Sequence, residues 1–134
     1  MDSTPNPSPA LPGGKGTVLV IEDEEVVRKG IASILSKGGY AVLSASDGVE
    51  GLEKIREHAE AIDLVLLDLS LPRMSGAEVI AHLKGMKSRA KVLVLSGYEA
   101  QAMGVSGVPS ILKPVRVREL LAQVGKALEV QERR

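Results

Sequence analysis

Five short apolar segments recur at fairly regular intervals along the chain. They occupy residues 17–22, 40–45, 63–68, 91–96 and 110–113. Most are continuous hydrophobic runs rather than alternations of apolar and polar positions. Continuous runs are typical of strands that are covered on both faces, as in a parallel sheet with helices on either side. The pattern therefore predicts five parallel strands.

The segments between these runs have the spacing and the end signals of helices. The first carries an apolar stripe and stops at Gly38 and Gly39, in the manner of a C-cap. Asp47 precedes the second helix and Ser75 the third, each with a glutamate three residues later, which is capping-box spacing. The last segment also has one apolar face. Only residues 99–103 are doubtful as a helix, because glycines flank them closely.

This alternation of strands and helices predicts an α/β fold. We expect a (βα)5 doubly wound parallel sheet with strand order 2-1-3-4-5 and helices on both faces. Residues 1–16 hold four of the seven prolines and three glycines, which predicts a flexible tail or linker. Residues 17–130 would form the single folded domain, and residues 131–134 a second short tail.

Composition and charge exclude several classes of protein. The 134 residues are 44% hydrophobic, enough for one core. The formal net charge of 0 argues against a nucleic-acid-binding surface. The absence of cysteine excludes disulfides and thiolate zinc sites. No apolar stretch approaches the ~18 residues of a membrane span and no signal peptide is evident, so we expect a cytoplasmic protein that binds no membrane.

Three carboxylates fall at the ends of two predicted strands. Glu22 and Asp23 end the first run, and Asp68 ends the third. In the expected strand order these two strands are neighbours, and the chemistry of such sheets collects at the carboxyl ends of the strands. Mutual repulsion would raise the pKa values of these groups unless a cation lies among them. Mg²⁺ is the simplest such cation, because it takes carboxylate oxygens and leaves positions open for a phosphate.

Two further polar side chains are expected at the same edge of the sheet. Ser96 ends the fourth run with a hydroxyl, and Lys113 ends the fifth with an ammonium group. A carboxylate that becomes phosphorylated needs its new oxygens held by a metal, a hydroxyl and a cation. The set therefore favours phosphoryl transfer to Asp68.

Four motifs in this order resemble the response-regulator receiver domain of two-component signalling, the CheY-like family. They are "VLVIEDEE", "LLDLSLPRMSG", "VLSG" and "LKP". The resemblance covers residues 17 to about 128 and implies a flavodoxin-like fold. It also implies a signalling receiver that assists its own phosphorylation and dephosphorylation, rather than a conventional enzyme.

The resemblance implies a role for each acidic residue. Asp68 would accept the phosphoryl group from a histidine kinase or a phosphotransfer protein. Mg²⁺ would be held by Glu22, Asp23 and Asp68, with the backbone carbonyl of Ser70 completing the protein ligands.

The resemblance also implies which residues respond to the phosphate. Ser96 would bond a phosphoryl oxygen, and Lys113 would pair with the acid or its phosphate. The peptide bond before Pro114 is typically cis in the family, which a proline permits at a cost of about 0.5 to 1 kcal/mol. A downstream protein target would then bind the face formed by the fourth helix, the fifth strand and the fifth helix.

Two departures from the family pattern concern the metal and the switch. Glu22 stands where aspartate is common, and its extra methylene could shift the ion or interpose a water molecule. Ser110 stands where receivers usually place the Phe or Tyr that swings inward, and the chain has no Phe or Trp. Tyr98 is the nearest ring in the sequence. We expect it to report the switch and to shield the acyl phosphate from water.

Other interpretations of the chain remain open. Glu22 and Asp23 could simply favour the next helix, and a receiver-like module could bind partners without phosphorylation. A phosphatase of the haloacid dehalogenase type would need an acid where Ser70 stands. A flavin or nucleotide carrier of this fold would meet four acids at residues 22–25.

The arrangement of the whole protein also has two alternatives. The "LSGY" and "LKPV" segments resemble receivers of hybrid histidine kinases, whereas the starting methionine favours a free-standing regulator. We expect the free-standing form.

Overall fold

The computed structural model describes residues 15–69, 71, 74–86, 88, 90–96 and 109–132, and the side chains of 96 and 129–132 are outside that description. Ser70, Tyr98, the doubtful helix at 99–103 and most of the expected N-terminal tail lie outside the described residues.

Five parallel strands form one sheet in the order β2-β1-β3-β4-β5. The strands are β1 (Thr17–Ile21), β2 (Ala41–Ala45), β3 (Leu64–Asp68), β4 (Lys91–Ser96) and β5 (Ser110–Leu112). Each boundary lies within one residue of the predicted run. The predicted strand order is confirmed.

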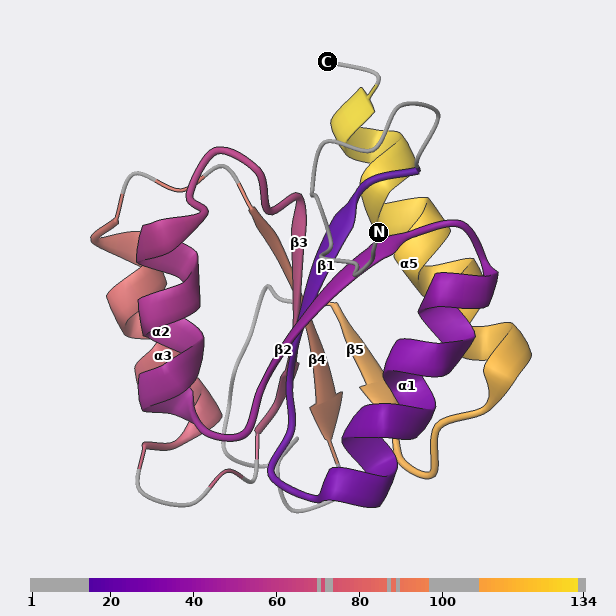
Figure 1. Ribbon diagram of the computed structural model, residues 1–134, viewed down its shortest axis with the longest axis horizontal. Helices are drawn as coiled ribbons and strands as arrows, with labels where there is room; N and C mark the ends of the chain where they lie inside the picture. Colours follow the sequence, from indigo (N-terminus) through magenta and orange to yellow (C-terminus); the bar gives the residue numbers. More distant parts are fainter. Residues whose placement is uncertain are drawn as a thin grey trace, which may run out of the picture.

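Helices cover both faces of this sheet. They are α1 (Glu25–Lys37), α2 (Gly48–Glu57), α3 (Gly76–Lys84) and α5 (Val117–Glu132). Figure 1 shows α2 and α3 against one face and α1 and α5 against the other. The doubly wound α/β fold is confirmed with these four helices. The remaining expected helix falls in the part of the chain that the structure does not describe.

The core lies in two layers, one on each face of the sheet. Along β1, Leu19 and Ile21 pack in the layer with α2 and α3, whereas Val18 and Val20 pack in the layer with α1 and α5. Every residue of β1 and β3 is buried. Burial on both faces explains why the sequence shows continuous apolar runs rather than alternation.

Side-chain caps begin two of the helices as the spacing predicts. The Asp47 carboxylate accepts a hydrogen bond of 2.8 Å from the backbone N–H of Glu50 at the start of α2. Ser75 and Glu78 form a complete capping box at the start of α3. In α2 the second hydrogen bond of the capping box goes to a different residue. Glu50 Oε1 accepts from the backbone N–H of Ser46 at 2.8 Å, and Ser46 precedes the N-cap residue Asp47.

The chain enters the domain at Lys15, beside the turn between α1 and β2. The backbone N–H of Lys15 donates to the carbonyl of Gly39 at 3.1 Å, and its ammonium lies 5.8 Å from the centroid of the Tyr40 ring. Gly39 has a φ of 102°, a conformation that favours glycine. Regular contacts therefore begin two residues before Thr17, the expected start of the domain.

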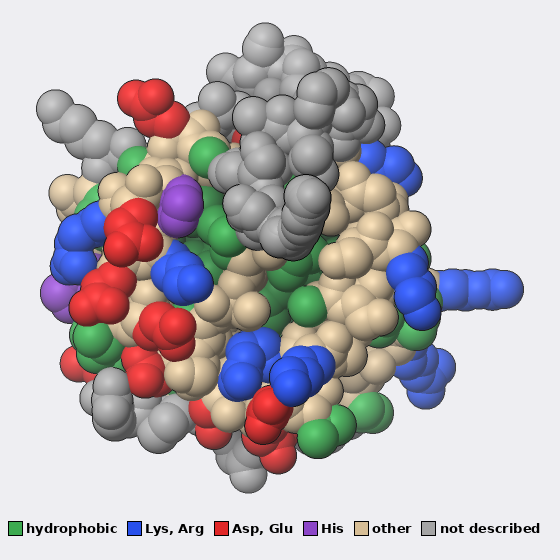
Figure 2. Space-filling view, in the orientation of Figure 1, with side chains coloured by type: hydrophobic (Ala, Val, Ile, Leu, Met, Phe, Trp, Pro, Cys, Tyr) green, Lys and Arg blue, Asp and Glu red, His purple; other side chains and the backbone are tan. Residues whose placement is uncertain are grey.

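Charged side chains are unevenly distributed over the surface. In Figure 2 the acidic side chains on the left, over α2, are mixed with basic ones, whereas the right side, over α1 and α5, carries mainly Lys and Arg. Among the described residues, no helix combines the length and the apolar character that crossing a membrane requires.

Gly30 gives a stability prediction. It is exposed in the interior of α1, and a Cβ added there would meet nothing within 4 Å. We expect Gly30→Ala to raise the free energy of unfolding by about 0.5–1 kcal/mol, because alanine costs less backbone entropy in a helix. Urea denaturation measures this change.

Gly51→Ala is the matched control, since Gly51 also lies inside a helix. A Cβ at this position would collide with the Cδ1 atom of Ile21, a fully buried side chain of β1. We expect this variant to be destabilised. Equal effects from the two alanines would contradict the proposed difference in packing.

Candidate functional site

The register of the sheet brings the predicted site residues to one edge. Ile21 of β1 pairs with Leu67 of β3, so the residues that follow them, Glu22 and Asp68, reach the carboxyl edge together. On the other side of β3, Ser96 of β4 pairs with Leu112 of β5. Residue 113 therefore leaves the sheet at this same edge.

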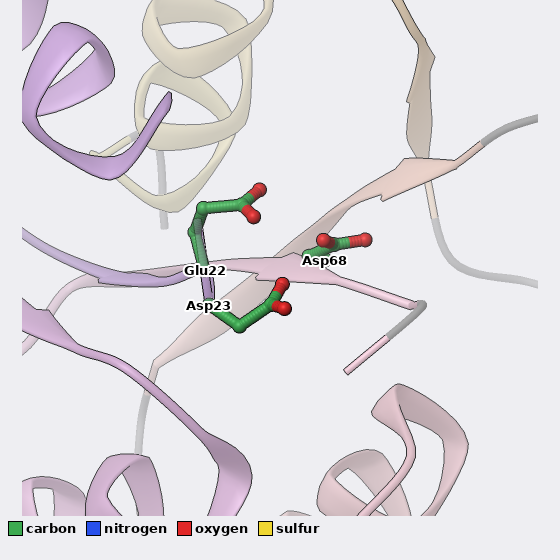
Figure 3. A group of neighbouring side chains, drawn as sticks. All are labelled: Glu22, Asp23 and Asp68. Atoms are coloured by element: carbon green, nitrogen blue, oxygen red, sulfur yellow. The ribbon is translucent and has the colours of Figure 1, made fainter. Parts of the chain in front are cut away.

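The three acidic side chains form one cluster. Each of Glu22, Asp23 and Asp68 offers a carboxylate oxygen, and these oxygens all lie within 4.8 Å of one another. Figure 3 shows Glu22 and Asp23 projecting from the end of β1 and Asp68 from the end of β3, with their carboxyl groups around one space. Glu22 and Asp68 are 0% and 2% exposed, whereas Asp23 is exposed. A ligand could therefore enter from the side of Asp23.

Lys113 brings a positive charge to the cluster. Its ammonium lies 3.1 Å from Oδ2 of Asp68 and 3.9 Å from Oε1 of Glu22. Burial alone would lower the pKa of this lysine. The hydrogen bond to Asp68 and the charges of Asp68, Glu22 and Glu24 outweigh burial, so the pKa is raised above its usual value. Lys113 is therefore held in its charged form next to Asp68.

Glu22 holds the loop after β1 with one oxygen and leaves the other buried. Its Oε2 accepts a hydrogen bond of 3.1 Å from the backbone N–H of Glu24. Its Oε1 is buried and has no hydrogen-bond partner among the described residues. Burial is the main cause that raises the pKa of Glu22 from 4.5 to about 7, with the charge of Asp68 adding to it.

The donor set fits a hard divalent cation. A buried carboxylate oxygen without a hydrogen-bond partner is costly, and a cation beside it would satisfy it. Carboxylate oxygens are the ligands that Mg²⁺ prefers, and Mg²⁺ usually keeps several water molecules as well. The predicted acidic pair and Asp68 therefore come together as a candidate metal site.

Arg28, which the sequence analysis did not single out, also contacts the site. Its Nη1 donates to the backbone carbonyl of Glu22 at 2.9 Å and to that of Asp23 at 3.4 Å. An arginine within a helical pattern is normally interpreted as a solvent-exposed residue. The sequence carries no signal that this side chain turns back toward the loop before its helix.

The structure describes Ser96, Ser110 and Pro114, the other predicted residues near the strand ends, to different extents. Ser96 is the last residue of β4, although its side chain lies outside the description. Ser110 is the exposed first residue of β5. The Lys113–Pro114 peptide bond is cis, as the resemblance implies.

Comparisons with known proteins settle the family. Residues 18–125 match the family model described as the response regulator receiver domain. The chain belongs to the response-regulator receiver family. The resemblance inferred from the four motifs is thereby confirmed, and the sheet order is that of the CheY-like receiver fold.

Individual receivers are similar over most of this chain. It is 33% identical over 125 residues to the sensor kinase CckA of Brucella abortus, covering 89% of this chain but only 13% of the kinase. It is 30% identical to the chemotaxis protein CheY of Treponema pallidum, covering 87% of this chain and 85% of CheY. A receiver domain from Clostridium thermocellum superposes with a TM-score of 0.82 at 27% identity, covering 87% of this chain and 97% of that one.

Membership in the family carries general properties. Receiver domains of two-component systems interact with histidine kinases and with downstream effectors, and they generally bind Mg²⁺. The acidic cluster of this receiver could hold such an ion.

Proposed function

We propose that Asp68 accepts a phosphoryl group from a histidine of a kinase or of a phosphotransfer protein. The observation that supports this most strongly is the contact of 3.1 Å between the buried Asp68 carboxylate and the Lys113 ammonium, within a cluster of three acids. A carboxylate can act as the nucleophile in such a transfer, and a cation beside it can stabilise the phosphoryl oxygens that it gains. The site therefore places the proposed nucleophile and a cation together at the edge of the sheet.

The proposed step transfers phosphorus from nitrogen to oxygen. An oxygen of Asp68 forms a bond to phosphorus while the bond between phosphorus and the donor imidazole nitrogen breaks. The imidazole leaves with the electron pair and takes up a proton. The ammonium of Lys113 lies close enough to Asp68 to pair with an oxygen of the transferred group.

We propose that Glu22, Asp23 and Asp68 hold Mg²⁺, with the backbone carbonyl of Ser70 as a further ligand. The buried Oε1 of Glu22 and the spacing of the three carboxylates support this assignment. When bound, the ion supplies positive charge that neutralises the transferred phosphoryl oxygens.

We propose that three further residues take part in the response to phosphorylation. Ser96 would bond a phosphoryl oxygen, while Tyr98 would report the change and shield the acyl phosphate. Ser110, exposed at the start of β5, takes the place of the usual aromatic ring. The downstream protein would bind the face formed by the fourth helix, β5 and α5.

Two arrangements of the protein fit this role. Coverage of 85% of the Treponema CheY supports a free-standing regulator, whereas the match to part of the sensor kinase CckA supports a receiver joined to a kinase. We propose the free-standing form. Its partners would be proteins rather than nucleic acid, given the formal net charge of 0.

Phosphorylation with a small donor tests the proposal. The protein is incubated with Mg²⁺ and acetyl phosphate, and its mass is compared with that of Asp68→Asn. We expect the wild type to gain one base-labile phosphate and the variant to gain none, because the amide is a poor nucleophile. Glu53→Gln, an exposed change on α2, should behave as wild type.

Beryllium fluoride gives an independent readout by amide NMR. Signals around the site should shift in the wild type and in Glu53→Gln, but not in Asp68→Asn. If the wild type gains no phosphate and does not respond to millimolar beryllium fluoride with Mg²⁺, the phosphorylation-independent module is the correct interpretation.

A further inference from the structure

We propose that Arg28 is a positioning residue for the divalent cation, because it fixes the backbone from which Glu22 and Asp23 project. This inference rests on the proposed Mg²⁺ site. It assigns a role to a side chain of α1 that offers no ligand atom itself.

The contact joins Arg28 to the backbone of the acidic pair. Nη1 donates to the carbonyl of Glu22 at 2.9 Å and reaches that of Asp23 at 3.4 Å. Both carbonyls lie after the last residue of β1 and before the first residue of α1. Neither the sheet nor the helix supplies its regular hydrogen bonds there, so a side-chain donor determines the orientation of these peptide groups.

Glu22 itself also restrains this loop, through its side chain and through its backbone N–H. Its Oε2 accepts from the backbone N–H of Glu24, while the backbone N–H of Glu22 still donates to Ala45 of β2 at 3.1 Å. Arg28 therefore restrains the carbonyl groups of this short loop, which the contacts of Glu22 do not hold. Rotation of either peptide plane would change the Cα–Cβ direction of Asp23, whose carboxylate must meet that of Asp68 at the metal.

Charge and hydrogen bonding make opposite predictions for Arg28. As a cation near the acidic cluster, it repels a second cation, so charge alone predicts tighter Mg²⁺ binding after its removal. If Arg28 acts as a donor that positions the ligands, its removal should weaken Mg²⁺ binding. The supporting contacts of metal ligands typically contribute 10–100-fold in affinity. The sign of the change in Kd separates the two roles.

The experiment measures the Kd for Mg²⁺ by amide NMR titration in the wild type, Arg28→Met and Lys29→Met. Methionine keeps an unbranched stem and the helix propensity but removes the guanidinium. Lys29 is the matched control, since it is exposed, pairs with Glu25 at 2.7 Å and is the next cation along α1. We expect Arg28→Met to raise the Kd about 10-fold and Lys29→Met to leave it unchanged or lower it.

Arg28→Lys tests whether the reach of the guanidinium matters. Lysine keeps the charge but is shorter, so it should not reach both carbonyls and should also weaken Mg²⁺ binding. If Arg28→Met fails to fold in thermal melts followed by circular dichroism, Arg28→Lys decides the question by the same titration.

The outcomes separate this inference from the proposed function. A wild type that does not bind Mg²⁺ overturns the metal site itself. A wild type that binds, with a folded Arg28→Met that binds equally or more tightly, overturns the role of Arg28 and leaves the phosphoacceptor proposal intact. A lower melting temperature with an unchanged Kd overturns it as well, because it assigns Arg28 to stability alone.

Discussion

Replacing Lys113 with methionine is expected to slow phosphorylation by acetyl phosphate about 100-fold, the typical effect of removing one donor from a developing anion. The ammonium lies 3.1 Å from Oδ2 of Asp68 and forms an ion pair with it. Methionine preserves the apolar stem but removes the ammonium that would pair with the carboxylate and then with its phosphate. A time course of the mass gain at saturating Mg²⁺ measures the rate.

The same variant should also change stability and metal binding. Asp68 and Glu22 are buried, so loss of Lys113 leaves their charges poorly compensated. About a third of the Lys113 side chain is exposed (32%). We therefore expect the free energy of unfolding to fall by about 1–3 kcal/mol, less than the penalty for breaking a fully buried pair. Mg²⁺ should bind more tightly to the variant, because it no longer competes with the ammonium.

Lys126→Met is the control, since this lysine is exposed on α5. It should retain the wild-type rate, stability and Mg²⁺ affinity. A Lys113→Met protein that is phosphorylated at the wild-type rate would show that the ammonium has no part in the transfer.

In the absence of divalent cations, Glu22 is expected to make the protein less stable as pH rises from about 4.5 to about 7. The pKa of Glu22 in the folded protein is raised to about 7 from 4.5, mainly by burial. The folded state therefore binds this proton more tightly than the unfolded state does. The stabilising contribution is complete below pH 4.5 and is lost as pH rises through 7, by about 1–3 kcal/mol in total.

Glu22→Gln isolates this contribution. Glutamine keeps the shape and an acceptor for the backbone N–H of Glu24 but cannot ionise. In EDTA we expect the variant to be more stable than the wild type at pH 8, with the difference shrinking toward pH 4.5. Urea denaturation at several pH values measures it, with Glu53→Gln as the exposed control. Parallel pH profiles for wild type and Glu22→Gln would contradict the buried, high-pKa glutamate.

Mg²⁺ should reverse the order of stability at pH 8. A cation that binds the folded state stabilises the wild type by mass action, whereas Glu22→Gln offers one fewer charged ligand. The gain in melting temperature on adding Mg²⁺ should therefore be larger for the wild type.

The strands could be predicted from the sequence because burial leaves continuous apolar runs in it, whereas their order was expected from the doubly wound fold class. β1 and β3 are buried along their whole length, so between Thr17 at the start of β1 and the acids at the strand ends their sequences are apolar. The capping signals at Asp47 and Ser75 were also correct, because a cap depends on residues only three positions apart.

The site could be predicted only in part, because its finer contacts depend on three-dimensional placement. Strand ends indicated that Glu22, Asp23 and Asp68 would meet. The sequence did not indicate that Glu22 is buried while Asp23 is exposed, or that Arg28 turns back onto two carbonyls. These features depend on the path of the loop between β1 and α1, for which the residue types carry no signature.

The entry of the chain at Lys15 has a practical consequence for attachment. Lys15 precedes β1, whose five residues span about 15 Å before the acidic cluster begins. α5 returns toward the edge of the sheet from which β1 starts, as Figure 1 shows. A purification tag, a sensor surface or a fused protein joined ahead of Lys15 would thus be attached beside the start of β1, at the opposite end of this strand from the carboxylates. An immobilised sample should leave them accessible to a docking kinase.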